Sequence, residues 1–307
     1  MNRGSFLKQT LLASAYLSLP AVQAQPGNKT IINMPIDRME KNNICTTCGT
    51  RYSNAAFNAA ACPVCLDDRQ YLGEDGQQWT SCQTLAKSRT IRFHQLQNNL
   101  FDLRITPSFA IGQKAHLVLS PSGNILWDCL PFLDDPGVAF IRSLGGLKAI
   151  AISHPHYYGL MAEWARRFDC PIYLHAADRQ WVMDESKQIV FWDGREQALW
   201  DGIKIVHTGG HFAGSTVLHL PHHGAKGSLL TGDSIYVSKD GRQLSAMYSY
   251  PNMIPLPAQA INYLVQQVKP LAFDSLYGAF EWMNIPDGAH AIFERSMHRY
   301  LGILTSA

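Results

Sequence analysis

The segment LKAIAIS, residues 147–153, runs directly into His154-Pro155-His156. Its short apolar run is rich in isoleucine and predicts a buried strand, on which side chains two apart point to the same face. Pro155 disfavours a helical conformation for the residue before it and fixes its own φ angle. The sequence therefore predicts that His154 and His156 lie side by side on an extended backbone, where the strand ends.

Two further polar side chains stand where later apolar segments run out. His211 lies within GGHFAGS, residues 209–215, and Asp233 ends the triplet TGD. Strand ends that meet at one edge of a sheet bring their side chains together, and zinc and iron accept imidazole and carboxylate as ligands. The sequence therefore predicts a metal site made of His154, His156, His211 and Asp233.

These motifs resemble those of the metallo-β-lactamase superfamily. Its members carry a Ser/Thr-His-x-His-x-Asp-His strand end, a later Gly-His-x-x-Gly-Ser and a Thr-Gly-Asp. The resemblance covers roughly residues 100 to 305. It implies an α+β fold, the αββα sandwich, with metal ions at one edge of the paired sheets and with hydrolysis of esters, thioesters, lactones or amides. More narrowly, the chain resembles bacterial-type metallo-hydrolases that carry an N-terminal zinc ribbon.

The chain departs from the family pattern at the second metal. Tyr158 and Gly159 stand where the family has the aspartate and histidine that usually bind that ion. The late Gly-His that completes the second site has no counterpart, because the matching stretch, residues 276–281, reads LYGAFE. The three histidines match the first metal's ligands, and Asp233 matches the carboxylate that bridges both metals. One ion, zinc or iron, is therefore expected.

Four cysteines near the N-terminus form two C-x-x-C pairs that are separated by thirteen residues. Two such pairs supply four thiolates and leave no open position, which is typical of a structural zinc site. The predicted ligands are Cys45, Cys48, Cys62 and Cys65. In an oxidising compartment the same residues would instead form two disulfides. The other cysteines have no companion at this spacing, so we expect buried apolar side chains at Cys82, Cys129 and Cys170.

Residues 1–24 have the features of a secretory signal peptide, because Arg3 and Lys8 precede a short apolar run. That run is too short to span a bilayer. We therefore expect export to the periplasm or the exterior, with a linker over residues 25–44. The alternatives are an organelle transit peptide or a frayed N-terminal helix, and a cytoplasmic protein is the alternative location.

The composition is that of a soluble globular protein. The chain has 307 residues, of which 46% are hydrophobic and only 16% are charged, and the formal net charge is +2. Average proteins have about 25% charged residues, and so small a net charge creates no field that attracts nucleic acid or an anionic membrane. We therefore expect a small-molecule substrate, no nucleic-acid partner and no membrane partner, while the oligomeric state stays open.

The order of predicted elements gives two parts. A zinc-ribbon-like module with its connector covers residues 45–92, and a metallo-β-lactamase-like domain covers residues 93–307. In that domain the turn SPSG joins strands at 115–119 and 124–128 into a hairpin. Hydrophobic periodicity predicts one further strand at 171–175, several strands between 189 and 237, and helices at 138–144, 160–168, 177–183, 258–268 and 287–304.

A three-histidine zinc site with an open position lowers the pKa of its bound water from 15.7 to about 7, so one metal-bound hydroxide could attack an acyl bond. We expect Asp233 and Tyr158 to take part in catalysis. Tyr158 or Tyr157 would orient water or stabilise an oxyanion, and packing against the following helix is the alternative for both. Asp128 is expected to hydrogen-bond a ligand imidazole and fix its tautomer.

Aromatic residues of later segments would line a largely apolar pocket if they reach the site. They are found in YSYP, residues 248–251, and at Phe280 and Trp282. Packing for stability is the alternative. His175 is expected in the protein interior and not among the ligands.

Two other functions are open. If only His154, His211 and Asp233 bind the ion, the set resembles two-histidine, one-carboxylate iron sites, and the function would be that of a mononuclear iron sulfur dioxygenase. That analogy is partial, because the superfamily's sulfur dioxygenases keep the neighbouring aspartate and histidine. In the second, the protein is a non-catalytic metal-binding protein of degenerate fold, whose ribbon serves as a docking module.

Overall fold

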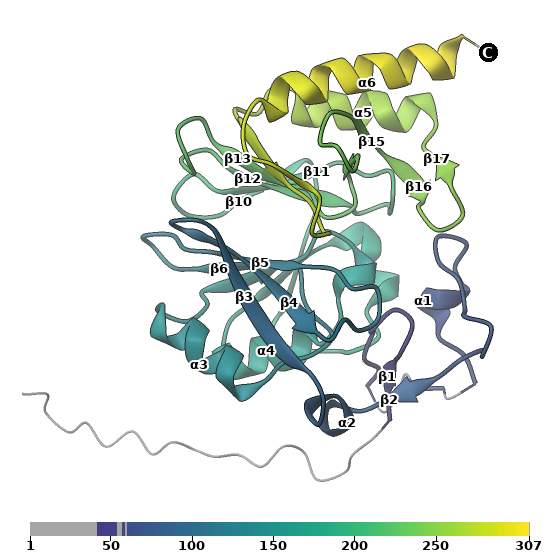
Figure 1. Ribbon diagram of the computed structural model, residues 1–307, viewed down its shortest axis with the longest axis vertical. Helices are drawn as coiled ribbons and strands as arrows, with labels where there is room; N and C mark the ends of the chain where they lie inside the picture. Colours follow the sequence, from purple (N-terminus) through teal and green to yellow (C-terminus); the bar gives the residue numbers. More distant parts are fainter. Residues whose placement is uncertain (1–41, 54–56, 59, 307) are drawn as a thin grey trace, which may run out of the picture. The chain divides into compact units, whose positions relative to one another are not determined.

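The computed structural model describes residues 42–53, 57–58 and 60–306 (Figure 1). The predicted signal peptide, residues 1–24, and nearly all of the predicted linker lie outside the described residues. Within the described ranges, no helix has both the length and the apolar character that a membrane span requires.

Two β-sheets form the centre of the molecule. The first has seven strands in sequential order: β3 (Thr90–Gln97), β4 (Leu100–Thr106), β5 (Ala115–Val118), β6 (Ile125–Trp127), β7 (Ala149–Ala151), β8 (Ile172–His175) and β9 (Ile189–Trp192). The second has six strands, also in sequential order: β10 (Glu196–Ala198), β11 (Lys204–His207), β12 (Thr216–Leu220), β13 (Ser228–Leu230), β18 (Ser275–Tyr277) and β19 (Asn284–Ile285).

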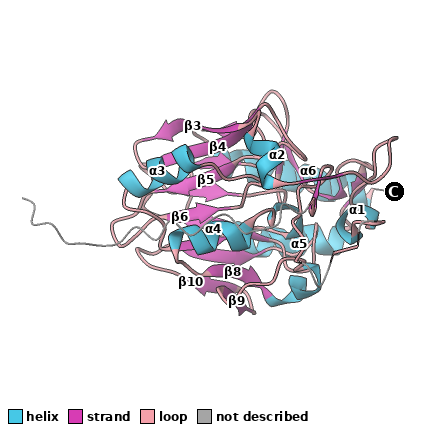
Figure 2. Cartoon of the chain, turned by 90° about the horizontal axis from the view of Figure 1, so that it is seen from below, coloured by secondary structure: helices cyan, strands magenta, loops and turns pink. Residues whose placement is uncertain are grey.

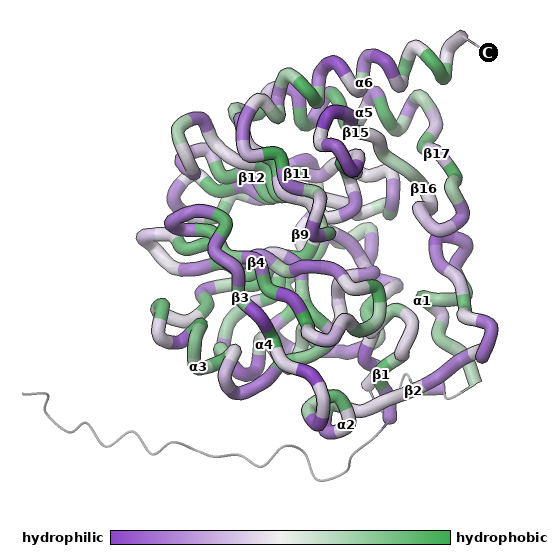
Figure 3. Tube along the Cα trace, in the orientation of Figure 1, coloured by the Kyte–Doolittle hydropathy of each residue, from purple (hydrophilic) through white to green (hydrophobic). Residues whose placement is uncertain are grey.

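Helices cover the outer faces of both sheets. On the first sheet lie α3 (Asp135–Ser143) and α4 (Met161–Phe168), which Figure 2 shows in front of the strands. On the second lie α5 (Ala258–Val268) and α6 (Ala289–Thr305) (Figure 1). In Figure 3, α6 alternates between hydrophobic and hydrophilic residues, as expected for a helix with one face on the core. The predicted αββα sandwich is confirmed.

Three apolar clusters hold these layers together. One packs α3 and α4 on the first sheet, and another packs α5 and α6 on the second. A third lies between the sheets and contains Leu100, Trp127, Ile205 and Leu230, all almost fully buried. Burying such side chains contributes about 1.5–3 kcal/mol each. The sandwich therefore provides a rigid frame for the segments that leave its strands.

The direction of the strands places the candidate ligands at one edge. β5 and β6 form the predicted antiparallel hairpin, and β6, β7, β8 and β9 then run parallel to one another. The carboxyl ends of parallel strands meet at the same edge, so Asp128 and Ser153, which follow β6 and β7, lie there with His175, the last residue of β8. β13 and β18 are also parallel, and Asp233 follows β13.

The backbone after β7 differs from the prediction. His154 is extended, with φ −169° and ψ 170°, but Pro155–Tyr157 forms the 3₁₀ turn η1, in which the Tyr157 amide donates to the His154 carbonyl at 3.1 Å. A proline is well suited to the first position of such a turn, because its missing N–H and fixed φ cost nothing there. The predicted extended pair is therefore wrong, and the two rings converge through a turn.

The N-terminal module has little regular structure. It contains β1 (Ile44–Cys45), which pairs with β2 (Trp79–Thr80), and the short helices α1 (Pro63–Leu66) and α2 (Cys82–Ala86). Its core consists of the four paired cysteines with Tyr52 and Val64, and it packs on Ile111, Trp181 and Met183 of the sandwich. The module and the sandwich thus form one compact unit, and the first sheet already begins at Thr90, slightly before the predicted boundary.

Small hairpins complete the second half of the chain. β14 (Tyr236–Val237) pairs with β15 (Leu244–Ser245), and β16 (Met247–Ser249) pairs with β17 (Ile254–Pro255). The β16–β17 hairpin meets the N-terminal module, because the Tyr248 hydroxyl donates to the Asp68 carboxylate at 2.5 Å and the Asn252 side chain donates to the Asp68 carbonyl at 2.9 Å. Residues far apart in the sequence are thus held together on one side of the sandwich.

Candidate metal centres

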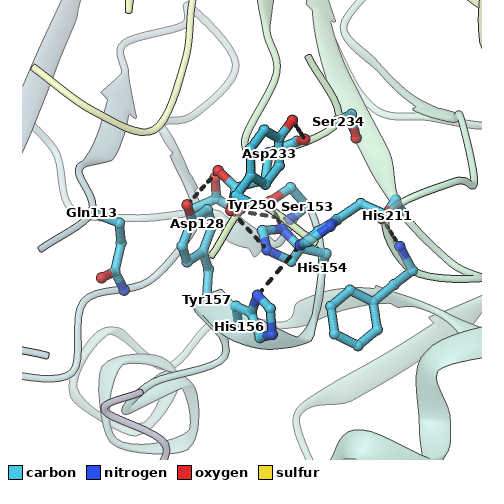
Figure 4. Close-up of polar contacts among 12 residues, drawn as sticks. Gln113, Asp128, Ser153, His154, His156, Tyr157, His211, Asp233, Ser234 and Tyr250 are labelled. Carbon is cyan, nitrogen blue, oxygen red and sulfur yellow. Dashed lines mark hydrogen bonds and ion pairs between the residues drawn. The ribbon is translucent and has the colours of Figure 1, made fainter. Parts of the chain in front are cut away.

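Three histidines and one aspartate converge at the edge of the sandwich. His154 follows β7, His156 lies in η1, His211 lies in the loop between β11 and β12, and Asp233 follows β13 (Figure 4). Each offers one ligand atom, and the four atoms lie within 4.8 Å of one another. All four side chains are buried. The structure thus brings together the whole predicted set.

The loop that carries His211 is closed by its own serine. The Ser215 hydroxyl accepts a hydrogen bond from the Phe212 amide at 2.8 Å, and the Ser215 carbonyl accepts one from the Thr208 amide at 2.8 Å. Nearby, Gly232 of the TGD triplet has φ +50° and lies directly against the Ser153 hydroxyl, so that a Cβ atom at this position would overlap it. Both motifs therefore hold strand ends close to the segment that carries His154.

Hydrogen bonds orient two of the imidazoles. Nδ1 of His211 lies 2.8 Å from the Tyr248 carbonyl, which can only accept, so this nitrogen carries the proton and Nε2 presents its lone pair to the site. Nδ1 of His154 lies 2.9 Å from the Ser153 hydroxyl. Burial lowers the pKa of His156 well below its usual value and that of His211 to about 3. The rings of His156 and His211 are therefore neutral, the form that binds a metal ion.

Asp233 is held by tyrosines from two sides. The Tyr157 hydroxyl donates to Oδ1 at 2.6 Å, while Oδ2 faces Nε2 of His154 at 3.5 Å. The Tyr250 hydroxyl donates to the Asp233 main-chain carbonyl at 2.7 Å. Burial acts to raise the pKa of Asp233, but the neighbouring imidazoles of His154 and His211 and the Tyr157 hydroxyl outweigh burial, so that the pKa is lowered. The carboxylate therefore stays ionised, with one oxygen directed at the histidines.

The spacing of these atoms fits a metal ion. Tetrahedral zinc with bonds of 2.0–2.1 Å to nitrogen requires ligand atoms about 3.3–3.4 Å apart. Nε2 of His211 lies 3.4 Å from Nδ1 of His156, and Nε2 of His154, which has no hydrogen-bond partner, lies 3.5 Å from Asp233. Three imidazoles and a carboxylate at this spacing are a ligand set that zinc and iron both accept.

The family model of the metallo-beta-lactamase superfamily matches residues 111–264, about half of the chain. The chain belongs to the metallo-beta-lactamase superfamily. It is 41% identical over 266 residues to the uncharacterized protein YmaE of Bacillus subtilis (strain 168), a match that covers 86% of this chain and 97% of YmaE.

The chain is also similar to solved structures. A structure of TMB-1, at 14% identity, covers 71% of this chain and 99% of that chain with a TM-score of 0.51. A metallo-beta-lactamase from Pontibacter korlensis, also at 14% identity, covers 71% of this chain and 100% of that chain with a TM-score of 0.49. At such low identity the likeness to TMB-1 concerns the fold alone.

Gly159 stands where the family pattern has a histidine, and its backbone conformation does not suit a side chain. Its φ is +45°, and a Cβ atom here would lie 3.1 Å from the main chain of Leu130. A histidine at this position would need both a strained backbone and space that Leu130 occupies. In the described part of the chain, the side chains that could hold a metal gather into two sets only, the histidine–aspartate set and a set of four cysteines.

Contrary to the prediction, Asp128 does not form a hydrogen bond to an imidazole. Its Oδ1 accepts from the Ser153 amide at 2.7 Å, and the Ser153 hydroxyl in turn contacts His154. Asp128 also has a φ of +62°, and burial raises its pKa to about 7. The direct bond was predicted wrongly because the strand end turns after Trp127, so that the carboxylate reaches the neighbouring strand's main chain. Asp128 therefore positions His154 through Ser153.

The two candidate tyrosines have different surroundings. Tyr157 contacts Asp233 as described, whereas Tyr158 is almost fully buried in the apolar cluster of the first sheet. Burial raises the pKa of both hydroxyls well above the usual value, so both stay protonated. Neither lines the cavity beside the ligands. Contact with the metal set is thus made by Tyr157 and not by Tyr158.

His175 stacks on His207, outside the ligand set.

A cavity of ≈ 200 Å³ opens beside the histidines. Of the metal set, His156, His211 and Asp233 line it. The remaining lining residues come from three regions of the chain, namely Thr47, Arg69, Gln70 and Tyr71 of the N-terminal module, Ala110 and Ile111, and Tyr236, Tyr250, Pro251 and Phe280 of the second half.

Some lining residues could be predicted from the sequence and others could not. Tyr250, Pro251 and Phe280 were predicted, whereas Trp282 stacks on Phe280 at 5.3 Å and is not among the lining residues. The contribution of the N-terminal module was missed, because no motif in the stretch DRQY, residues 68–71, marks it as part of a site. Only the fold brings this stretch to the cavity.

The four paired cysteines form the second candidate centre. Sγ of Cys45 lies 3.6 Å from that of Cys65, and Sγ of Cys48 lies 3.6 Å from that of Cys62. Zinc–sulfur bonds of 2.3 Å in a tetrahedron require about 3.8 Å between sulfurs. All seven cysteines are free thiols, and the four are fully or nearly fully buried. The structure thus favours a four-cysteine metal site over two disulfides.

The burial of the three other cysteines largely agrees with the prediction. Cys129 and Cys170 are buried in the apolar cluster of the first sheet, and Cys82 packs partly buried against it. Burial raises the pKa of Cys170 to about 12. These thiols are therefore unreactive parts of the core.

Proposed function

We propose that this protein is a metal-dependent hydrolase that cleaves an acyl bond, an ester, thioester, lactone or amide, in a small molecule. The observation that supports the proposal is the position of the histidine–aspartate set, whose members His156, His211 and Asp233 line the cavity. A substrate in this cavity would therefore lie against the metal ligands. A zinc ion held there would polarise a carbonyl and lower the pKa of water to about 7.

The chain's own residues set up this chemistry. The Tyr248 carbonyl fixes the tautomer of His211, and the Tyr157 hydroxyl holds one oxygen of Asp233 so that the other faces His154. These contacts keep the ligand atoms in place before substrate arrives, which reduces the cost of reorganisation during the reaction. Asp233 therefore serves as a ligand with a fixed orientation.

Tyr236 is the residue that we propose stabilises the oxyanion. It lines the cavity beside Asp233, and its ring packs against Tyr250 at 5.7 Å. Unlike the hydroxyls of Tyr157 and Tyr250, its hydroxyl has no hydrogen-bond partner in the part of the chain that the structure describes. A hydroxyl that is free to donate within a site supports a developing negative charge on a substrate oxygen.

The geometry favours a hydrolase over the two alternatives. His156 completes a set of three histidines, because its Nδ1 lies 3.4 Å from Nε2 of His211, whereas the iron alternative needs only two. The non-catalytic alternative leaves the cavity beside the ligands without a purpose. A second metal, the four-cysteine zinc, would have a structural role, because no ligand position remains open in that set.

The proposal is tested with purified, zinc-loaded protein and one representative each of phenyl esters, thioesters, lactones and anilides. We expect hydrolysis of at least one class, and a loss of activity in Asp233→Asn. Tyr236→Phe should lower kcat about 10- to 100-fold with little change in KM. Tyr300→Phe is the matched control, because the Tyr300 hydroxyl donates to the Ala246 carbonyl and is not at the cavity. Full metal occupancy without hydrolysis of any class would contradict the proposal.

A further inference from the structure

We propose that Arg69 binds a carboxylate of the substrate, so that the N-terminal module makes the enzyme selective for anionic acyl compounds. This inference rests on the proposed hydrolase function and names its substrate class. The observation behind it is a guanidinium from the cysteine module in the wall of the cavity that His156, His211 and Asp233 also line.

Aromatic rings hold the Arg69 guanidinium in place. Its Cζ lies 4.3 Å from the ring centroid of Phe212, 4.7 Å from that of Tyr248 and 5.9 Å from that of Trp181. The Phe212 ring in turn lies 4.8 Å from the ring of His156 and 5.2 Å from that of His211. The cation is therefore fixed next to the ring that packs on the metal ligands, and binding an anion there loses little side-chain entropy.

Arg69 forms an ion pair with Asp67, but its hydrogen-bond donors are only partly used within the protein. One nitrogen, Nη1, donates to Asp67 at 2.7 Å, and the same carboxylate accepts from the Arg69 amide at 3.0 Å. Nε is buried and has no hydrogen-bond partner, and no other bond from the guanidinium occurs among the described residues. A guanidinium presents five donors in a planar fork that matches a carboxylate. Arg69 therefore has donors left for a bound anion.

Arg69 is also distinct among the charged groups of the cavity. Among the described residues that line it, Arg69 alone carries a permanent positive charge. The two lining histidines are neutral, and Asp233 faces the ligand set. Close by, Asp68 accepts from the Tyr248 hydroxyl. An anionic substrate would thus find a single oriented cation beside the metal site.

The four-cysteine site fixes where Arg69 stands. The loop that carries Arg69 follows Cys65 closely, and its far side is tied to the β16–β17 hairpin through the hydrogen bonds of Asp68 with Tyr248 and Asn252. The N-terminal module therefore contributes to the substrate site in addition to any contribution that it makes to stability.

The test compares two phenyl esters with the same leaving group and acyl length, anionic phenyl hydrogen succinate and neutral phenyl butyrate. In Arg69→Gln we expect KM for the anionic ester to rise about 10- to 100-fold, the usual effect of losing hydrogen bonds to a charged group. KM for the neutral ester and both kcat values should change little. Arg69→Lys, which keeps the charge without the fork, should have an intermediate KM for the anionic ester.

The matched control is Arg179→Gln, because Arg179 stacks on Phe191 at 3.6 Å and lies outside the cavity lining. Arg179→Gln should leave KM and kcat for both esters unchanged. Equal effects of Arg69→Gln on both esters, or no effect on either, would overturn the inference. If Arg69→Gln loses its metals and does not fold, the comparison of Arg69→Lys with wild type on the two esters decides in the same way.

Succinate binding separates this inference from the proposed function. Calorimetric titration of succinate into the zinc-loaded protein should show binding that weakens about 10- to 100-fold in Arg69→Gln and not in Arg179→Gln. If no ester is hydrolysed but this pattern holds, the hydrolase proposal fails and the anion site stands. If wild type does not bind succinate, the anion site is wrong.

Discussion

The two candidate metal centres of this chain are built in opposite ways. The four cysteines come from two short turns within residues 45–65, and their sulfurs close a complete shell. The histidine–aspartate set comes from segments spread over residues 154–233, and it borders a cavity. A local, closed set can organise a small module that has little core of its own, whereas a dispersed set depends on a fold that already exists.

This difference assigns different roles to the two ions. Loss of the cysteine-bound ion should disturb folding of the module, and loss of the histidine-bound ion should abolish chemistry while the sandwich stays folded. The two centres are nevertheless linked, because Arg69, which follows the cysteine turns, lines the cavity beside the histidines. The predictions below separate the two roles.

The largest expected effect is on activity, in His211→Ala. Removing one of three imidazoles should release the histidine-bound ion and lower kcat/KM by about a thousandfold or more. The unfolding free energy should change far less than in a cysteine variant. His290→Ala, a partly exposed histidine outside the set, is the control for hydrolysis assays and denaturant unfolding. Unchanged activity in His211→Ala would remove the histidine site from the mechanism.

The next largest effect is on stability, in Cys48→Ala. Because metal binding and folding of the module are coupled, its loss should cost on the order of 5 kcal/mol in the unfolding free energy, measured with denaturant. The histidine-bound ion should remain. Cys170→Ala is the matched control, since Cys170 is buried outside both sets and should cost about 1 kcal/mol. Equal losses in the two variants would show that the four cysteines hold no stabilising ion.

In the metal-free protein, the free energy of unfolding should change with pH by a few kcal/mol. His211 has a pKa of about 3 in the folded chain, against 6.5 ordinarily, so the unfolded state binds more protons between these values. Stability should therefore fall as the pH drops from about 6.5 towards 3. His211→Gln should flatten this slope in pH-dependent denaturant unfolding.

A variant is needed for this comparison, because Asp128 acts with the opposite sign. Its folded pKa is raised to about 7, so its contribution to stability is lost as the pH rises towards that value. An unaltered slope in His211→Gln would mean that His211 does not stay neutral in the fold.

The smallest effect is expected in Tyr157→Phe. Losing the 2.6 Å hydrogen bond to Asp233 leaves one carboxylate oxygen without its donor, which should lower zinc affinity or kcat about tenfold. Tyr158→Phe, the neighbouring variant, should change neither, because Tyr158 packs in the apolar cluster. The reverse outcome would place the functional hydroxyl on Tyr158. Competition with a zinc chelator measures the affinity.

The sequence predicts the fold and both ligand sets because these depend on short motifs with fixed spacing. The motifs of His154 and Asp233 follow buried strands that have a parallel neighbour, and the motif of His211 forms the loop between the antiparallel strands β11 and β12. The αββα layers follow from the same alternation of strands and helices. Both ligand sets were therefore predicted residue by residue.

The remaining features depend either on a local backbone choice that the sequence leaves open or on contacts that span the chain. The 3₁₀ turn at Pro155 was missed, because proline suits both an extended segment and the first position of a helical turn. The contact of Asp128 with Ser153 follows from a left-handed backbone at Asp128. Arg69 reaches the cavity only because the module docks against the β16–β17 hairpin. No local pattern encodes these placements.

The measurement that tests the account most directly is elemental analysis of purified wild type beside His154→Ala and Cys45→Ala. We predict two metal ions per wild-type chain. One ion should be lost in His154→Ala and the other in Cys45→Ala, so that each variant keeps the ion that its partner loses. Three ions in wild type would contradict a single-ion histidine site, and an unchanged metal content in Cys45→Ala would contradict a four-cysteine metal centre.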